Sequence, residues 1–278
     1  MATVTEPATA EQWVSAFRRA VEAQKRVFAD HAGIAARSTY EGVGEGGDRT
    51  LVIDRLCEDA LFAELESLHQ AGNSFTAISE ERGTVEFGDP SPIRVVIDPI
   101  DGSLNARRTV PCHSLSVAVA HGDSMADVSV GYVYEFGAGE EFVAVAGEGA
   151  TLDGAPLGVP DGDGLELVAV EASKPERMVK VATALDGHAY RLRSPGTIAI
   201  SLCYVGAARF DGALSSRPCR SVDAAAGQLI VREAGALVRF GEADLADTPL
   251  GLDARYHVAA ARTASDLDLV RRAQEAVQ

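Results

Sequence analysis

The sequence has little positive charge. Its 278 residues include 25 lysines and arginines against 41 aspartates and glutamates, which gives a net charge of −16 at pH 7. Nucleic acids and anionic membranes are bound mainly by clustered basic side chains, so the charge balance argues against both as the main partner. A small anionic substrate remains compatible with it, because bound divalent cations reverse the local field.

Cysteine is also scarce, and its spacing excludes one kind of site. The four cysteines, Cys57, Cys112, Cys203 and Cys219, form no C-x-x-C pair and no cluster with histidine, so a zinc site is not expected. Isolated cysteines of this kind are typical of reduced, mainly buried thiols in a cytoplasmic protein.

Long hydrophobic runs are missing as well. No apolar segment approaches the roughly 18–20 residues that are needed to span a bilayer. Residues 1–10 include Glu6 but neither a basic stretch nor an apolar core, so no signal peptide is expected. With 46% hydrophobic residues, the chain is predicted to be a soluble cytoplasmic protein with a substantial core.

The first half of the chain is predicted to be mixed α+β. Apolar residues at helical spacing predict helices over residues 10–33 and 51–69. Short β-branched or alternating runs predict strands, the last three of which should form an antiparallel meander. These strands cover residues 76–79, 94–97, 114–120, 128–134 and 141–146.

The second half is predicted to be α/β, because strands alternate with helices along it. Residues 147–163, rich in Gly, Asp and Pro, are the expected boundary between an N-terminal half (1–150) and a C-terminal half (151–278). The predicted strands are 167–170, 190–193, 209–214 and 258–261. The predicted helices are 174–185, 196–205, 223–234 and a terminal helix capped by Ser265.

One stretch, residues 94–105, joins a strand to candidate chemistry. The strand is predicted to end before Pro99, because proline lacks the N–H that would continue a ladder. Asp98 and Asp101 then lie three residues apart in a turn closed by Gly102. Carboxylates at the end of a strand, followed by a glycine turn, suit hard metal ions and an anion. Alone, such a turn is more often a solvated acidic loop.

Two further acidic groups could join this turn. Glu80 and Glu81 follow one predicted strand, and Asp223 lies in the first turn of a predicted helix. Each has an ordinary explanation alone, because adjacent glutamates are usually solvated and an acid at a helix start complements the helix dipole. If the groups converge, they form an all-oxygen site. Mg²⁺ suits such a site, because it takes few carboxylates, keeps waters and bridges to phosphate.

The residues in these clusters resemble a known family. Asp98-Pro99-Ile100-Asp101-Gly102-Ser103-Leu104-Asn105 is similar to the D-P-[IL]-D-G-[ST]-x-N signature of the inositol monophosphatase family. Residues 222–227 and 233–235 resemble its second signature, and residues 79–81 resemble its glutamate motif. The motifs follow the family's order, and the similarity extends over about residues 10–275.

The resemblance implies a fold and an activity. Residues 46–54, 131–134 and 196–199 look closest to the branch that includes bifunctional inositol monophosphatase/fructose-1,6-bisphosphatases. The implied fold is a layered α/β/α/β/α sandwich, and the implied assembly is a homodimer. The implied activity is Mg²⁺-dependent hydrolysis of phosphomonoesters by direct attack of water, without a phosphoenzyme.

The resemblance also implies roles for individual residues. Two or three Mg²⁺ would be held by Glu80, Asp98, the Ile100 carbonyl, Asp101 and Asp223. Glu80 would orient the attacking water, and the Ser103 hydroxyl would relay a proton with Asp48. The substrate would contact Asp101, Gly102, Ser103, Gly196 and Thr197, and the backbone amides of Gly102 and Ser103 would hold its phosphate.

The chain departs from the family pattern at several positions. Ser221-Val222 stand where a tryptophan often precedes the aspartate of the second signature. Ser216 stands where the inositol-specific branch has a glutamate that grips a sugar hydroxyl, and Arg217 and Arg220 lie beside it. Arginine binds phosphate bidentately, so these two residues favour a substrate with a second anionic group. Lone arginines on a loop are more often solvated.

The sequence therefore predicts a phosphatase of small phosphorylated polyols or sugars. Inositol-1-phosphate ranks first and fructose-1,6-bisphosphate second, followed by histidinol phosphate and 3′-phosphoadenosine 5′-phosphate. A rival hypothesis is a regulator that binds a phosphorylated ligand without hydrolysing it. A competent carboxylate fills every side-chain ligand position, which counts against that rival. A Ca²⁺-binding module would need a D-x-D-x-D loop, which the sequence does not contain.

Overall fold

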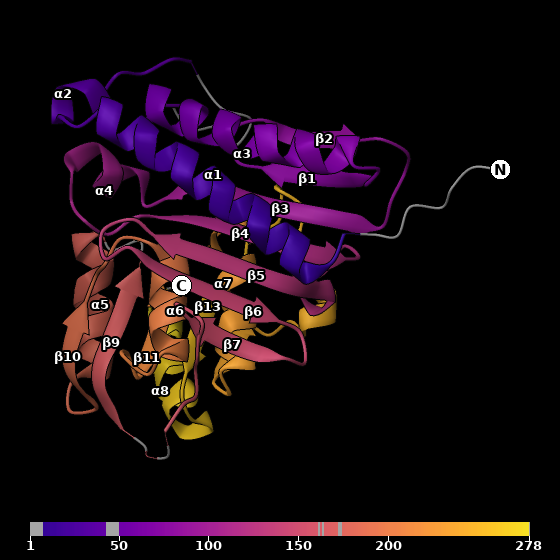
Figure 1. The fold of residues 1–278 in the computed structure, drawn as a ribbon. Coiled ribbons are helices and arrows are strands. Elements are labelled where there is room, and N and C mark those ends of the chain that lie inside the picture. Colours follow the sequence, from indigo (N-terminus) through magenta and orange to yellow (C-terminus); the bar gives the residue numbers. More distant parts are fainter. Residues whose placement is uncertain (1–7, 43–49, 161, 163, 172–173, 278) are drawn as a thin grey trace.

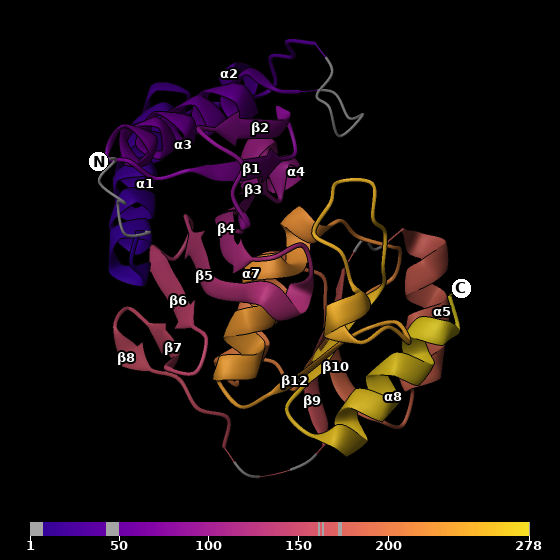
Figure 2. The same ribbon diagram turned by 90° about the vertical axis from the view of Figure 1, so that its right-hand side faces the viewer.

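The computed structural model describes residues 8–42, 50–160, 162, 164–171 and 174–277. In this part of the chain, helices and two sheets alternate in five layers (Figure 1). Helices α1 (Ala10–Asp30) and α3 (Val52–Gln70) cover the first sheet, and α6 (Ile198–Gly206) and α7 (Ser221–Glu233) lie between the sheets (Figures 1 and 2). Helices α5 (Pro175–Leu185) and α8 (Ala264–Glu275) cover the second sheet. The expected α/β/α/β/α sandwich is confirmed.

The first sheet has eight strands in the order β2-β1-β3-β4-β5-β6-β7-β8. All neighbours are antiparallel except β1 and β3, which are parallel. The expected meander is β4, β5 and β6. The strands are β1 (Phe75–Ser79), β2 (Gly83–Phe87), β3 (Ile93–Asp101), β4 (Ser114–His121), β5 (Val128–Glu135), β6 (Glu140–Val145), β7 (Gly149–Leu152) and β8 (Ala155–Pro156).

The second sheet has five strands in the order β10-β9-β11-β13-β12. Strand β9 is parallel to both its neighbours, and β13 is antiparallel to both of its own. The strands are β9 (Leu165–Glu171), β10 (Ala189–Arg193), β11 (Gly212–Ser215), β12 (Leu237–Phe240) and β13 (Val258–Ala261). Short helices complete the chain: α2 (Ile34–Arg37), α4 (Ser103–Arg108) and the 3₁₀ turns Met125–Asp127 and Leu245–Asp247.

The outer helix α1 follows directly from its sequence. Thr9 caps it with a capping box, in which the Gln12 amide donates to the Thr9 hydroxyl and the Thr9 amide donates to the Gln12 side chain. Trp13 and Phe17 then lie on one buried face, where they pack against strands of the first sheet. Burying such side chains stabilises the fold by about 1.5–3 kcal/mol each.

The middle layer is held at close range by small residues. Helix α7 is buried at ten of its positions, and its run Ala224-Ala225-Ala226-Gly227 packs between the two sheets. A methyl group added to Gly131 of β5 would lie 2.7 Å from the Ala226 carbonyl oxygen. A methyl group on Gly227 would lie 2.9 Å from the Leu202 Cβ atom of α6. Glycine at these two positions sets how near α7 comes to its neighbours.

Two predicted boundaries are wrong. Strand β3 does not end before Pro99 but continues to Asp101, because the register shifts between Asp98 and Asp101. Such a bulge takes the intervening residues out of the ladder, so the missing proline N–H costs no ladder hydrogen bond. Helix α8 is capped by Thr263, whose hydroxyl accepts from the Asp266 amide, and not by Ser265.

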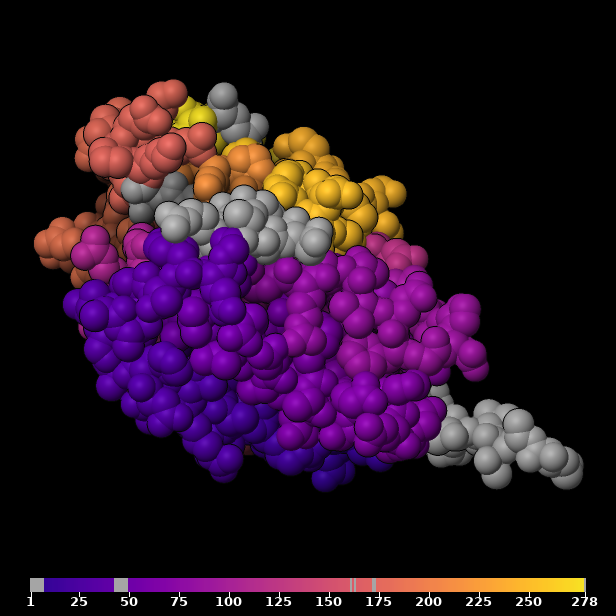
Figure 3. All heavy atoms as spheres, turned by 90° about the horizontal axis from the view of Figure 1, so that it is seen from above, coloured from indigo at the N-terminus to yellow at the C-terminus, as the bar shows by residue number. Residues whose placement is uncertain are grey.

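Several helices and strands of the structure have no counterpart in the sequence prediction. The strands β2, β7, β8 and β12 and the short helix α4 were not predicted from the sequence. Among the described helices, none is long and apolar enough to cross a bilayer. All four cysteines are free thiols. On the face in Figure 3, the indigo-to-purple surface of the early chain adjoins the orange-to-yellow surface of the late chain.

The close approach of β5 to α7 makes a stability prediction. Replacing Gly131→Ala forces a methyl group against the Ala226 backbone, and overpacking of this kind costs about 1–3 kcal/mol. We expect urea denaturation to show that loss in the free energy of unfolding. The control is Gly158→Ala, where an added Cβ meets nothing within 4 Å. A Gly131→Ala variant as stable as the control would contradict this account of the middle layer.

Candidate metal and phosphate site

Three acidic side chains converge where the first sheet meets α7. Glu80 begins the turn between β1 and β2, Asp98 lies on β3, and Asp223 lies in the first turn of α7. One carboxylate oxygen from each lies within 4.8 Å of the others. The parallel pairing of β1 with β3 explains part of this, because it sets Ser79 opposite Ile97 and so brings Glu80 beside Asp98.

The convergence strongly disfavours ionisation of these groups. Burial is the main cause that raises the pKa of Glu80 to about 7, with the charges of Asp223 and Glu81 adding to it. Burial also raises the pKa of Asp98 well above its ordinary value, and repulsion from Glu80, Asp101 and Asp223 adds to that shift. A cation among these carboxylates would therefore be strongly stabilised.

Arg220 lies among the acidic groups. Its guanidinium donates to Glu80 Oε1 at 2.7 Å, and its backbone amide donates to Asp223 Oδ2 at 2.8 Å. The Arg220 charge opposes the rise in the pKa of both Glu80 and Asp223. Arg220 was predicted from the sequence to contact substrate, and in this structure its side chain is instead paired with a predicted metal ligand.

Asp101 stands beside this group rather than within it. Its Oδ2 atom accepts a hydrogen bond from the Thr197 hydroxyl and another from the Ala199 amide at 2.7 Å. Within the described residues, both hydrogen bonds to the Asp101 carboxylate fall on this one oxygen. Thr197, which was predicted to contact substrate, is buried, and its hydroxyl is used within the protein to hold the Asp101 carboxylate.

The predicted phosphate loop leads directly into α4. Gly102 precedes this helix with a φ of 88°, a conformation that glycine adopts readily. A Cβ on Gly102 would lie 3.1 Å from the Cys112 carbonyl oxygen and 3.3 Å from that of Gly196. Two predicted substrate residues, Gly102 and Gly196, therefore lie side by side. Ser103 follows at the first position of α4 and is half-buried.

The remaining predicted residues are placed as follows. The Ile100 amide donates to Asp98 Oδ1 at 3.0 Å, which orients that carboxylate. Ser216 is buried, whereas Arg217 beside it is exposed. Asp48, the predicted proton-relay partner of Ser103, lies outside the described residues. The catalytic, ligand and substrate roles given to these residues stay predictions.

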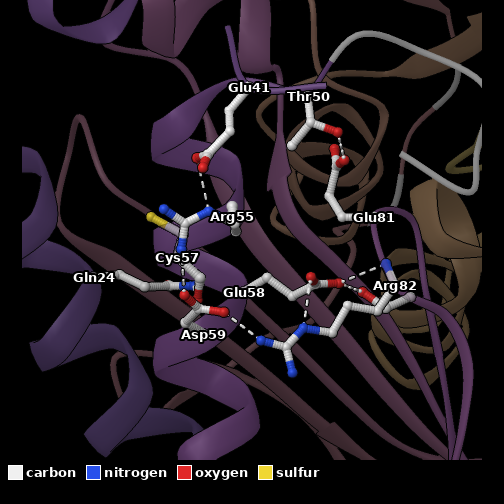
Figure 4. Close-up of polar contacts among 10 residues, drawn as sticks. Gln24, Glu41, Thr50, Arg55, Cys57, Glu58, Asp59, Glu81 and Arg82 are labelled. Atoms are coloured by element: carbon white, nitrogen blue, oxygen red, sulfur yellow. Dashed lines mark hydrogen bonds and ion pairs between the residues drawn. The ribbon is translucent and has the colours of Figure 1, made fainter. Parts of the chain in front are cut away.

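Two buried carboxylates near Glu80 were not predicted. Glu58 of α3 accepts from the Ser79 hydroxyl at 2.5 Å. It also accepts from the Arg82 amide at 3.2 Å (Figure 4). Glu58 therefore braces both ends of the Glu80 turn. Asp54, one helical turn earlier, is 5% exposed, and among the described residues its Oδ1 atom has no hydrogen-bond partner. The sequence did contain a signal for this pair: Asp54 and Glu58 lie at helical spacing on the same face of α3 as the buried Leu61 and Leu65.

The comparisons with known proteins decide the family. The family model described as "Inositol monophosphatase family" matches residues 7–278. The chain belongs to the inositol monophosphatase family. It is accordingly a phosphomonoesterase hydrolase with the fold of that family, and Mg²⁺ is the metal generally expected for such proteins.

Relatives in this family carry more than one name. The fructose-1,6-bisphosphatase/inositol-1-monophosphatase of Methanothermobacter thermautotrophicus is 31% identical over 259 residues, which cover 90% of this chain and 91% of that protein. The Nus factor SuhB of Pasteurella multocida is 36% identical over 193 residues, which cover 67% and 69% of the two chains. The names do not single out one substrate.

Solved structures agree on the fold. A crystal structure of an inositol monophosphatase-fructose 1,6 bisphosphatase superposes with a TM-score of 0.78 at 27% identity and covers 94% of this chain and 99% of that one. The Thermotoga maritima IMPase gives a TM-score of 0.76 at 22% identity, with 97% and 98% covered.

The donor atoms fit the expected metal. Glu80, Asp98 and Asp223 offer carboxylate oxygens, which are the ligands that Mg²⁺ prefers, and they offer few enough of them to leave room for water and phosphate. Neither histidine nor cysteine belongs to this three-residue group, so a softer metal is not favoured.

The buried carboxylate of Asp54 leads to a prediction for the metal-free protein. Burial raises the pKa of Asp54 from 3.8 to about 7, so the folded state binds its proton more tightly than the unfolded state does. This contribution to stability is complete below pH 4 and is lost as the pH rises through 7. We expect the free energy of unfolding, measured in chelator, to fall over that window by up to about 1.4 kcal/mol per pH unit for one proton.

Asp54→Asn should reduce this slope by the share of one proton, because asparagine has no proton to lose, while the raised pKa values of Glu80 and Asp98 maintain the rest. The matched control is Asp30→Asn, which removes an exposed carboxylate at the end of α1 and should leave the slope unchanged. The slope would be wrongly assigned to Asp54 if both variants behaved like the wild type.

Proposed function

We propose that this chain hydrolyses a small phosphorylated polyol or sugar with two or three Mg²⁺, and that inositol-1-phosphate is its first substrate. The observation that carries the proposal is the convergence of Glu80, Asp98 and Asp223, with oxygens within 4.8 Å of one another. These side chains come from two parts of the chain that are more than 120 residues apart. Solvated acidic residues with no common function would have no reason to meet there.

Different residues of this chain would bind the ions, orient the water and relay its proton. When bound, Mg²⁺ supplies an acidified water and neutralises charge on the phosphoryl oxygens. Glu80, Asp98, Asp223, the Asp101 carboxylate and the Ile100 carbonyl would hold the ions. Glu80 would orient the attacking water, and Ser103 would relay its proton.

The phosphate would lie against the loop that starts α4. There the backbone amides of Gly102 and Ser103 would donate to the phosphoryl oxygens. Because Gly196 lies beside Gly102, the rest of the substrate would extend toward the start of α6. The absence of a Cβ at both glycines lets these two backbone segments pack closely, Gly102 against the Gly196 carbonyl and Gly196 against the Asn105 side chain.

Fructose-1,6-bisphosphate is the second candidate, and one observation favours it. Ser216 is buried, its amide donates to the Glu171 carbonyl, and its carbonyl accepts from Arg177 at 2.8 Å, so its backbone is fully used. Because Ser216 is buried, the exposed side chain of its neighbour Arg217 is the one that a substrate could reach. An arginine there suits a second phosphate better than a sugar hydroxyl. Histidinol phosphate and 3′-phosphoadenosine 5′-phosphate rank below it.

Two further expectations stay proposals of lower rank. The homodimer implied by the family and a cytoplasmic location remain predictions for this chain. A regulator that binds phosphorylated ligands without turnover is the alternative from outside enzymology. The first activity experiment separates it from a phosphatase.

The activity prediction concerns Asp98. We expect the wild type to release phosphate from inositol-1-phosphate only when Mg²⁺ is present, and Asp98→Asn to lower kcat/KM by at least about 100-fold, because it removes a charged metal ligand. The control is Asp268→Asn, an exposed acid on α8, which should retain wild-type activity. Equal rates for Asp98→Asn and wild type would reject the metal site. Calorimetric ligand binding without phosphate release would favour the regulator.

The specificity prediction concerns Arg217. If it binds a second phosphate, Arg217→Ala should lower kcat/KM for fructose-1,6-bisphosphate about tenfold or more, the loss of roughly 1.5–3 kcal/mol for a charged hydrogen bond. Activity on inositol-1-phosphate should stay within about threefold. Arg239→Ala, an exposed arginine on β12, serves as the matched control. Parallel loss on both substrates would show that Arg217 does not discriminate between them.

A further inference from the structure

A buried glutamate at the end of β9 has no role in the site described so far. Glu171 is 2% exposed and is the last residue of this strand. Its Oε2 atom accepts from the Gly196 amide at 3.0 Å, and its Oε1 atom accepts from the Ser201 hydroxyl at 2.5 Å. A buried carboxylate is costly unless donors satisfy it, so its presence here needs an explanation.

Both donors belong to the start of α6. Gly196 lies just before the N-cap Thr197, and Ser201 lies one turn inside the helix. Glu171 therefore ties the beginning of α6 to the end of β9 at two points five residues apart. Desolvation raises the pKa of Glu171, while the hydrogen bonds from Ser201, Gly196 and the Thr197 backbone oppose that rise.

The same turn of α6 holds Asp101. Thr197 donates its hydroxyl to Asp101 Oδ2, and the Ala199 amide donates to the same oxygen. The turn is also fixed from the other side, because the Asn105 side-chain amide donates to the Pro195 carbonyl at 2.7 Å. The orientation of Asp101 thus depends on where residues 195–199 sit.

We propose that Glu171 is a positioning residue for the metal site: by holding the 196–201 turn it fixes the donors that orient the Asp101 carboxylate. The inference rests on the proposed function only in taking Asp101 as a metal ligand. Outer residues of this kind set the direction of a ligand's free oxygen, and their loss typically weakens metal binding 10–100-fold. Glu171 itself touches neither phosphate nor ion.

The test measures Mg²⁺ binding directly, by isothermal titration calorimetry on the full chain. Glu171→Ala should raise the Mg²⁺ dissociation constant about tenfold or more. Glu171→Gln should stay within about threefold of the wild type, because the glutamine carbonyl can accept from Gly196 and its amide can donate to Ser201. Glu171→Met fills a similar volume but cannot replace these hydrogen bonds, so it should bind Mg²⁺ as weakly as Glu171→Ala does. Rescue by both glutamine and methionine would show that Glu171 acts only through packing.

A matched control separates this role from general destabilisation. Glu135 is also 2% exposed, and it too accepts two hydrogen bonds from one turn, from the amides of Gly137 at 3.0 Å and Ala138 at 2.9 Å. Glu135→Ala should lower the Tm as Glu171→Ala does and yet leave the Mg²⁺ dissociation constant unchanged. Weakening of Mg²⁺ binding by the same factor in both variants would overturn the proposal.

A double-mutant cycle tests the route. Thr197→Val removes the hydroxyl bond to Asp101, so it should weaken Mg²⁺ binding through the same carboxylate. If Glu171 acts through this turn, Glu171→Ala combined with Thr197→Val should be about as weak as the weaker single variant. Multiplication of the two effects would contradict the proposed route.

Two outcomes keep the inference and the proposed function apart. A wild type that binds Mg²⁺ but hydrolyses no phosphomonoester would reject the proposed function, while the cycle would still test Glu171. A wild type that hydrolyses its substrate, with unchanged Mg²⁺ binding in Glu171→Ala, would reject the inference alone. Should Glu171→Ala not fold, Ser201→Ala removes one of the two bonds, and wild-type Mg²⁺ binding in both it and Thr197→Val would overturn the proposal.

Discussion

The repulsion among buried carboxylates is the constraint on which this structure depends. Glu80, Asp98 and Asp223 bring their oxygens within 4.8 Å of one another in a largely desolvated place. Burial is the main cause of the raised pKa values of Glu80 and Asp98, and the like charges placed together there add to it. The fold reduces the cost of this arrangement with Arg220, whose guanidinium forms an ion pair with the Glu80 carboxylate. A divalent cation would remove this cost more fully.

The first sheet and the middle layer of the fold both contribute to this site. The first sheet supplies Glu80 and Asp98 through the parallel pair β1 and β3, and the middle layer supplies Asp223 through α7. The turn that begins α6 adds the donors that hold Asp101. Accurate placement therefore depends on the core between the two sheets as much as on the residues that would touch the ion.

Features that depend on local sequence patterns could be predicted from the sequence. Most of the central strands followed from β-branched or alternating runs, although the end of β3 did not, and the three acidic clusters were found without a structure. The partners of buried charges could not be found that way. Arg220 meets Glu80 across 140 positions of sequence, and Asp101 meets Thr197 across 96, and no periodicity encodes such pairs. Asp54 and Glu58 were missed because they occupy an apolar helix face, where a charge is unexpected until its partners are known.

The small residues of α7 have a meaning that their chemistry does not suggest. Ala224, Ala225, Ala226 and Gly227 belong to a stretch that resembles a functional signature, yet they carry no group that could bind or catalyse. Their packing against β5 and α6, where Gly131 and Gly227 have no room for a methyl group, makes them a spacer that sets the width of the site. Because Asp223 lies on the same helix, a bulkier residue in this spacer would push α7 away from its neighbours and move the Asp223 carboxylate with it.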